Sequence, residues 1–210
     1  MLVKGIRALS VRAVRLSMRG LARGPHITRF FMYRRLAAFK QSTKTNTKIL
    51  SISHSDRLCE VFGLDRQSMT EANYPAVSML SLPYPDNSFD YVVSDQVLEH
   101  VEGDPQRAID ETLRVLRPGG LALHATCFIN PIHEAPGDFW RSTPAALRLL
   151  CRGFSSIIEC GGCGNPYVWV VVWLGLRFDG VPEAAWHPLH KLAVRNDPDW
   201  PIVTWVIARK

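Results

Sequence analysis

The sequence contains no run of about 18 apolar residues, so nothing in it predicts a membrane-spanning helix. Acidic residues are also missing from its beginning. Residues 1–55 contain no Asp or Glu and 12 Lys or Arg, whereas the other 155 residues hold 13 basic and 19 acidic residues. The net charge of +6 therefore comes from a basic N-terminal segment joined to a mildly acidic body. Basic segments of this kind suit phosphates, anionic lipids or nucleic acids.

Cysteine is scarce and irregularly spaced. Five cysteines without a paired pattern argue against a disulfide framework and for a reducing, cytoplasmic location. Cys160 and Cys163 form a C-x-x-C motif, but no second ligand pair and no helix start accompany it, which favours an ordinary structural role. His124, His133 and Glu134 lack a compact spacing on one element, so we expect no metal site.

The N-terminal segment combines apolar residues with regularly spaced arginines. The arginines follow steps of three and four residues: Arg12, Arg15, Arg19 and Arg23. This spacing predicts a basic amphipathic helix within residues 1–24, and a polar linker follows at 41–47. The helix either packs on the domain with its arginines in water or attaches residues 1–40 peripherally to an anionic membrane surface. An organellar transit peptide is less favoured.

Short apolar stretches alternate with helix signals along the rest of the chain. Strands are predicted near residues 48–53, 69–72, 89–95, 121–128 and 156–160 and at the C-terminus. The strongest helix begins at Asp104 and Pro105 and stops at the Pro-Gly-Gly of 118–120. This alternation predicts an α/β fold with a mainly parallel sheet. We expect residues 1–47 to form a basic helical arm with its linker, and residues 48–210 to form one domain in which 164–200 are an insertion or cap.

Three segments stand in a fixed order within residues 81–120, SLPYPDNSFDYVVSDQVLEHVEGDPQRAIDETLRVLRPGG: 82–90, 97–101 and 114–120. In these segments the sequence resembles the class I S-adenosylmethionine-dependent methyltransferases of type 11. The resemblance implies a Rossmann-like, doubly wound sheet and S-adenosyl-L-methionine as the cofactor. We expect methyl transfer to an oxygen or nitrogen atom of a small polar molecule or glycan.

The resemblance places the cofactor at the carboxyl ends of the central strands. It implies seven cofactor-binding residues: Ser53, His54, Ser55, Glu71, Ser78, Asp95 and Gln96. The first strand-to-helix turn, residues 53–55, would hold the amino-acid end of the cofactor. Glu71 would bind the ribose hydroxyls, Ser78 the adenine amine, and Asp95 the ammonium group.

Two of these positions depart from the family pattern. The first turn has no glycine, and Ser78 stands where the family has an aspartate, a change that would weaken binding by about 1–2 kcal/mol. The alternative to an enzyme is therefore a catalytically inactive module of the same fold that serves binding or scaffolding. A first turn whose own side chains fill the cofactor cavity would favour that alternative.

The substrate side is expected after the fourth and fifth strands. His100 and His133 are the candidate catalytic residues, since a neutral histidine can accept the substrate proton. Asp138, Trp140 and Arg141 are candidates for recognising a polar substrate. The alternative interpretation makes His100 orient its loop, pairs Asp138 with Arg141, and packs Trp140 under the loop. No RNA- or DNA-reading module is recognisable, so nucleic acid is an unlikely partner.

Overall fold

The computed structural model describes residues 2–41, 46–134 and 136–210, with side chains from residue 8 onward. It divides into two compact units. We call residues 35–162 and 202–210 the sheet unit, and residues 1–34 and 163–201 the arm unit. Residues 1–34 of the expected arm and the whole of the expected insertion, 164–200, thus belong to one unit, whereas residues 35–47 belong to the sheet unit.

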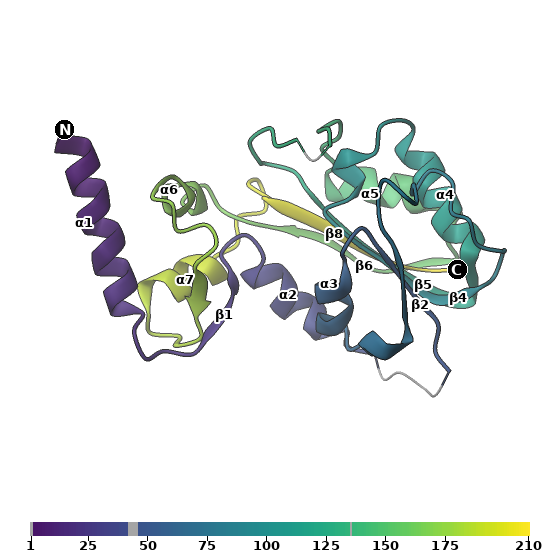
Figure 1. Ribbon diagram of the computed structural model, residues 1–210, viewed down its shortest axis with the longest axis horizontal. Coiled ribbons are helices and arrows are strands. Elements are labelled where there is room, and N and C mark those ends of the chain that lie inside the picture. The colour runs from purple at the N-terminus through teal and green to yellow at the C-terminus, as the bar shows by residue number, and fades with distance from the viewer. Residues whose placement is uncertain (1, 42–45, 135) are drawn as a thin grey trace. The chain divides into compact units, whose positions relative to one another are not determined.

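The sheet unit is built on a six-stranded sheet of order β3-β2-β4-β5-β8-β6 (Figure 1). Its strands are β2 (Ile49–Ile52), β3 (Met69–Ala72), β4 (Phe89–Asp95), β5 (Leu116–Cys127), β6 (Ser156–Cys163) and β8 (Val203–Arg209). The first four strands of this order run parallel, and β8 is antiparallel to β5. The prediction of an α/β fold with a mainly parallel sheet is confirmed.

The order of the strands decides where a ligand site can form. Strand β2 pairs with β3 on one side and with β4 on the other, so the chain reverses its winding direction at the β2–β4 pair. Right-handed crossovers then place the following helices, α3 (Asp56–Val61) and α4 (Pro105–Val115), on opposite faces of the sheet, as Figure 1 shows. Ligands of open α/β sheets bind at the carboxyl ends of strands at such a reversal.

Helix α4 has the N-cap that the sequence predicts. The side chain of Asp104 accepts a hydrogen bond from Gln106 N, and Pro105 is the first helical residue. Its buried face consists of Ala108, Ile109, Thr112 and Val115. The helix ends at Val115, and β5 starts at once at Leu116 rather than at the predicted residue 121. Leu116 pairs with Phe89, and an irregular register takes up residues 117–120.

Arg114 gives a structural reason for the spacing of the sequence block. Its guanidinium donates to Leu82 O at 2.9 Å, to Tyr84 O at 2.8 Å and to the Asp86 carboxylate at 2.8 Å. It also pairs with Glu111, and that hydrogen bond lowers the pKa of the Glu111 carboxyl. The R-V-L-R-P-G-G segment therefore pins the turn that precedes β4. This network fixes the loop and performs no chemistry.

Helix α5 (Pro144–Leu150) completes the sheet unit, together with 3₁₀ turns at Arg66–Ser68, Leu98–His100 and Cys151–Gly153. The arm unit contains α1 (Leu2–Ser17), β1 (Arg23–His26), most of α2 (Phe30–Ala37), α6 (Val168–Trp173), β7 (Gly180–Pro182) and α7 (Pro188–Val194). Strands β1 and β7 pair antiparallel. The N-terminal helix ends at Ser17, earlier than the end of the predicted segment. Within the described residues, no helix is both long and apolar enough to cross a bilayer.

Candidate active site

The turn after β2 is left-handed at two successive residues. Ser53 has a φ of 49° and His54 a φ of 62°. This region costs a residue with a side chain about 1–2 kcal/mol, and glycine enters it freely. Two hydrogen bonds hold the turn, from Ser53 N to Ala72 O at 3.0 Å and from His54 N to Asn73 Oδ1 at 3.0 Å. The backbone therefore has the shape that glycine favours, although no glycine is present.

Ser55 joins the ends of the two central strands. Its side chain is buried, its hydroxyl donates to Ile52 O, and its Oγ accepts from Asp95 N at 2.7 Å. The hydroxyl thus both donates and accepts a hydrogen bond inside the protein. Ser55 fixes the position of the first turn relative to the end of β4.

A cavity of about 490 Å³ opens beside this turn. It is lined by Ser53, His54, Tyr74, Val77, Ser78, Met79, Leu80, Gln96, Val97, His100, Val101, Glu102 and Pro136. Its volume falls in the range of about 300–1,000 Å³ that is typical of small-molecule sites. The first turn borders the cavity and leaves it open.

The cavity brings together only part of the predicted cofactor set. Ser53, His54, Ser78 and Gln96 line it, together with the candidate base His100. Ser55, Glu71 and Asp95 are not among its lining residues. Ser55 is occupied between the strand ends, as described above. Glu71 lies exposed on the edge strand β3, where its carboxylate accepts from Asn73 Nδ2 at 2.9 Å. A ribose-binding role for Glu71 stays a prediction.

Gln96 lines the cavity, and its side chain carries a buried donor that makes no hydrogen bond within the described part of the chain. Its backbone is left-handed, with a φ of 59°, and its N–H donates to Ala125 O at 2.8 Å. Its side-chain Nε2 is buried and has no hydrogen-bond partner among the described residues. A buried donor without a partner costs about 1–3 kcal/mol, so this amide is suited to donate to a ligand.

His100 is held in one orientation. Its Nδ1 contacts the carbonyl oxygen of Gly137, which can only accept, so Nδ1 carries the proton and Nε2 is left as an acceptor. The imidazole also packs edge-to-face against the His133 ring, with 5.0 Å between the ring centres. The loop-orienting contact and the base function that the sequence suggested as alternatives are therefore compatible.

The polar side chains of the loop after β5 form hydrogen bonds and an ion pair within the protein. Arg141 Nη2 pairs with the Asp138 carboxylate at 2.6 Å, and His133 N donates to the same carboxylate at 2.8 Å. The hydrogen bond from Arg141 holds the pKa of the Asp138 carboxyl well below its usual range. Trp140 Nε1 donates to Val101 O at 2.8 Å. None of His133, Asp138, Trp140 and Arg141 lines the cavity, and their catalytic and substrate-binding roles stay predictions.

Sequence reasoning missed the apolar side of the cavity, which is formed by Tyr74, Val77, Met79 and Leu80. These residues lie in the connection between β3 and β4, where the only signal was the position of Ser78 before the Leu82 motif. Ser78 itself is engaged locally, since its Oγ accepts from Leu80 N at 3.2 Å.

The family model of a type-11 methyltransferase domain matches residues 36–124, which include β2, α3, β3, β4 and α4. Residues 36–124, less than half of the chain, are therefore similar to a class I methyltransferase domain. A probable S-adenosylmethionine-dependent methyltransferase of Mycolicibacterium smegmatis is 42% identical over 93 residues, which cover 40% of this chain and 34% of the relative. The chain thus spans about a third of the length of that curated relative.

Solved structures share the fold of the methyltransferase domain. Phosphoethanolamine N-methyltransferase 2 of Haemonchus contortus, solved with S-adenosyl-L-methionine, aligns with a TM-score of 0.55 and 15% identity over 85% of this chain and 52% of its own. The [4+2]-cyclase SpnF aligns with a TM-score of 0.52 and 20% identity over 85% and 79% of the two chains. At these identities the likeness establishes the fold alone.

The cofactor of this methyltransferase family is S-adenosyl-L-methionine, and the cavity suits it in its position and its lining residues. The cavity lies at the strand reversal, is bordered by the left-handed first turn, and is lined by Gln96, whose buried Nε2 makes no hydrogen bond with the described residues. Ser53, His54, Ser78 and Gln96 are the predicted cofactor residues that the structure brings to this cavity.

Proposed function

We propose that this chain is an S-adenosylmethionine-dependent methyltransferase that acts on an oxygen or nitrogen atom of a small polar molecule or glycan. The observation that carries the proposal is the open cavity beside the first turn, with an unused buried amide in its wall. Because the altered turn leaves this cavity open, the competing interpretation as an inactive module loses its main motivation.

When bound, S-adenosyl-L-methionine supplies the methyl group together with its own leaving group. The chain's task is then to position the reactants, which can contribute about 7–11 kcal/mol to lowering the barrier. Gln96 Nε2 and the Ser78 hydroxyl would bind and orient the cofactor. His100, with its proton held on Nδ1 by Gly137, would accept the substrate proton on Nε2, an effect worth about 10²–10⁴-fold in rate.

Gln96→Ala tests this assignment at the cofactor. Removal of the Nε2 donor should weaken S-adenosylhomocysteine binding about tenfold, which corresponds to one lost hydrogen bond of roughly 1.4 kcal/mol. The matched control is Gln67→Ala, at an exposed glutamine on a 3₁₀ turn, which should bind like the parent protein. Isothermal titration measures both. Equal affinities for the two variants would remove Gln96 from the site.

His100→Gln tests the base. The amide can still contact Gly137 O but cannot take up the substrate proton, so cofactor affinity should stay within about twofold while turnover falls about 10²–10⁴-fold. A panel of amine, phenol, carboxylate and sugar acceptors, assayed by release of S-adenosylhomocysteine, identifies the acceptor class. Loss of cofactor binding in this variant would assign His100 to positioning instead.

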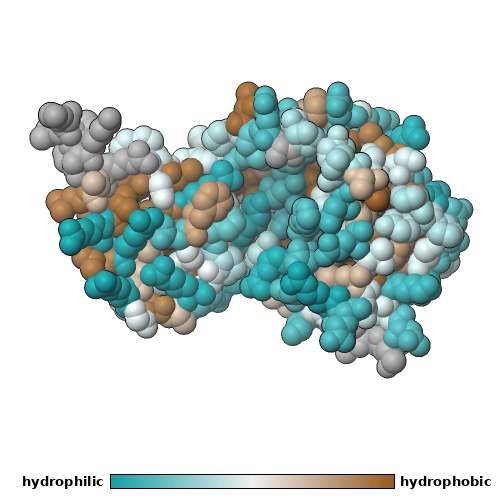
Figure 2. All heavy atoms as spheres, viewed as in Figure 1, coloured by the Kyte–Doolittle hydropathy of each residue, from teal (hydrophilic) through white to brown (hydrophobic). Residues whose placement is uncertain are grey.

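We also propose that the protein attaches peripherally to anionic membrane surfaces through residues 1–40. The arm unit has 11 Lys or Arg against four Asp or Glu, a net charge of +7, whereas the rest of the chain has −1. Of the 15 large apolar side chains that are exposed in the described part of the chain, nine belong to the arm unit, including Trp173, Phe178 and Trp186. Figure 2 shows apolar side chains gathered among hydrophilic ones over this unit. Exposed aromatic residues combined with arginines are typical of interfacial binding.

Vesicle flotation tests the attachment. Each basic residue near an anionic bilayer contributes about 1 kcal/mol, so replacing Arg12 and Arg19 by glutamate should lower partitioning at least about 30-fold. The control reverses two exposed arginines of the sheet unit, Arg57 and Arg152, and should leave flotation close to that of the parent. Flotation that is unchanged when Arg12 and Arg19 are replaced by glutamate, or that is equally strong with neutral vesicles, would contradict the proposal.

A further inference from the structure

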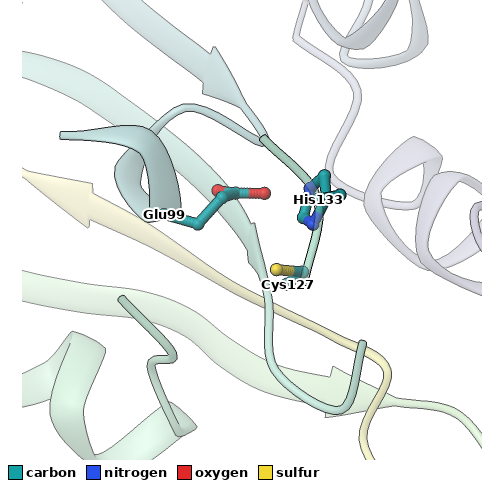
Figure 3. Close-up of side chains that lie close together, drawn as sticks. All are labelled: Glu99, Cys127 and His133. Atoms are coloured by element: carbon teal, nitrogen blue, oxygen red, sulfur yellow. The ribbon is translucent and has the colours of Figure 1, made fainter. Parts of the chain in front are cut away.

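Three potential metal ligands meet next to the wall of the cavity. They are Glu99 from the 3₁₀ turn Leu98–His100, Cys127 at the end of β5, and His133 in the loop that follows. One ligand atom from each lies within 4.8 Å of the other two. Figure 3 shows the carboxylate, the sulfur and the imidazole turned toward one another. The three residues come from separate elements, so no local sequence motif announces them.

Glu99 is the observation that points to a ligand. The residue is fully buried, and its Oε2 accepts from Thr126 Oγ1 at 2.7 Å. The other oxygen, Oε1, is also buried and makes no hydrogen bond with the described residues. Its neighbour is the thiol of Cys127, a weak donor whose pKa is raised to about 12 by burial and by the Glu99 carboxylate, so it brings no positive charge. A buried carboxylate needs a partner for its charge, and a cation among the three side chains would supply one.

The chemistry of the donor set selects the kind of cation. Carboxylate oxygen, thiolate sulfur and imidazole nitrogen are the ligands of Zn²⁺, whereas Mg²⁺ and Ca²⁺ prefer oxygen alone. A bound cation would hold Cys127 as the thiolate, and together with the Glu99 carboxylate it would present two negative charges, which a divalent ion balances. Arg141 is nearby, but its charge is already matched by its pair with Asp138. Tetrahedral zinc ligands lie about 3.5 Å apart, so the three side chains must approach by about 1 Å.

The imidazole that would have to move is the accessible member of the set. The His133 side chain is 34% exposed and lies on a loop. Its Nδ1 lies 2.9 Å from Asn130 Nδ2 and 3.4 Å from the Asp138 carboxylate. Outer contacts of this kind orient metal-binding histidines. Glu99 and Cys127 are thus the two fixed, buried ligands, and the His133 side chain would move toward them to complete the site.

We propose that Glu99, Cys127 and His133 bind one Zn²⁺ ion, whose fourth position is taken by water or by a substrate atom. The sequence alone predicts no metal site, because these ligands come from separate elements and share no local spacing. None of the three proposed ligands lines the cofactor cavity, so metal binding and cofactor binding can be measured separately.

Cobalt titration of the full chain without a histidine tag tests the site. After treatment with a chelator, the protein should bind one equivalent of Co²⁺ with a thiolate-to-cobalt absorption band, and Zn²⁺ should displace it. Cys127→Ser should abolish the band, and Glu99→Gln should weaken binding at least about tenfold. Cys151→Ser is the matched control, because Cys151 is another buried free cysteine of the sheet unit. It should bind cobalt like the parent.

X-ray absorption of the zinc-loaded parent protein covers the case in which variants fail to fold. The expected first shell is one sulfur and three oxygen or nitrogen atoms. A shell without sulfur, binding of less than about half an equivalent at tenfold excess of metal, or an unchanged cobalt band in Cys127→Ser would each overturn the proposal.

Discussion

The left-handed conformation of the first turn predicts that glycine is more stable than alanine at residue 54, the reverse of the usual order. At most positions a glycine is less stable than an alanine, by about 0.5–1 kcal/mol, because it loses more backbone entropy on folding. At His54, with a φ of 62°, alanine keeps the left-handed cost of about 1–2 kcal/mol and glycine removes it. His54→Gly should therefore be more stable than His54→Ala by about 0.5–1 kcal/mol.

The comparison within one position removes the histidine side chain from both variants, so only the backbone differs. Asp110, exposed in the middle of α4, is the control, and there glycine should be less stable than alanine by about 1 kcal/mol. For a chain of this size each kcal/mol moves the melting temperature by about 2–4 °C. Differential scanning calorimetry resolves such shifts. A glycine variant at 54 that melts at or below the alanine variant would refute the left-handed turn.

Three further outcomes follow from buried polar groups. Ser55→Ala should lower the free energy of unfolding by about 1–3 kcal/mol, because Asp95 N loses its acceptor, whereas Ser88→Ala at an exposed turn should change it by less than about 0.5 kcal/mol in urea unfolding. Burial lowers the pKa of His124 to about 4. Between about pH 6.5 and 4 the unfolded chain therefore binds one more proton than the folded chain, and the free energy of unfolding decreases by about 1.4 kcal/mol for each unit that the pH falls. His124→Gln should flatten this slope when unfolding is measured across the acid range. The pKa of Asp138 is lowered, so its contribution is present above about pH 4 and disappears as the pH falls below that value; Asp138→Asn should lower stability by about 3 kcal/mol at pH 7 and much less at pH 3, as urea unfolding at the two pH values measures.

The fold was predictable because its signals are local. Asp104 and Pro105 define the start of α4, and buried apolar runs define the parallel strands. The motifs within residues 81–120 could be recognised because their spacing has a structural basis: Arg114 joins two of the segments through hydrogen bonds to loop carbonyls. The immediate passage from Val115 into β5 was not predictable, because pairing of Leu116 with β4 overrides the Pro-Gly-Gly signal for a turn.

The sequence predicted where the site lies but not its backbone conformation or the contacts between its elements. Pattern reasoning placed Gln96 and His100 just after the fourth strand, and the structure brings both residues to the cavity lining. It could not assign a positive φ to Ser53 and His54, because that conformation is held by hydrogen bonds from their own N–H groups to the end of β3 and to the following Asn73. It also could not foresee that Glu99 faces away from the cavity lining toward Cys127, since that contact joins residues from different elements.

The measurement that tests the central claim most directly is a thermal melt of the unsubstituted chain with S-adenosyl-L-methionine. If the cavity beside the first turn binds the cofactor, a hundredfold excess over the dissociation constant stabilises the native state by about 2.7 kcal/mol. The melting temperature should then rise by about 5–10 °C. No rise at millimolar cofactor, with a normal melt of the protein alone, would contradict the methyltransferase assignment.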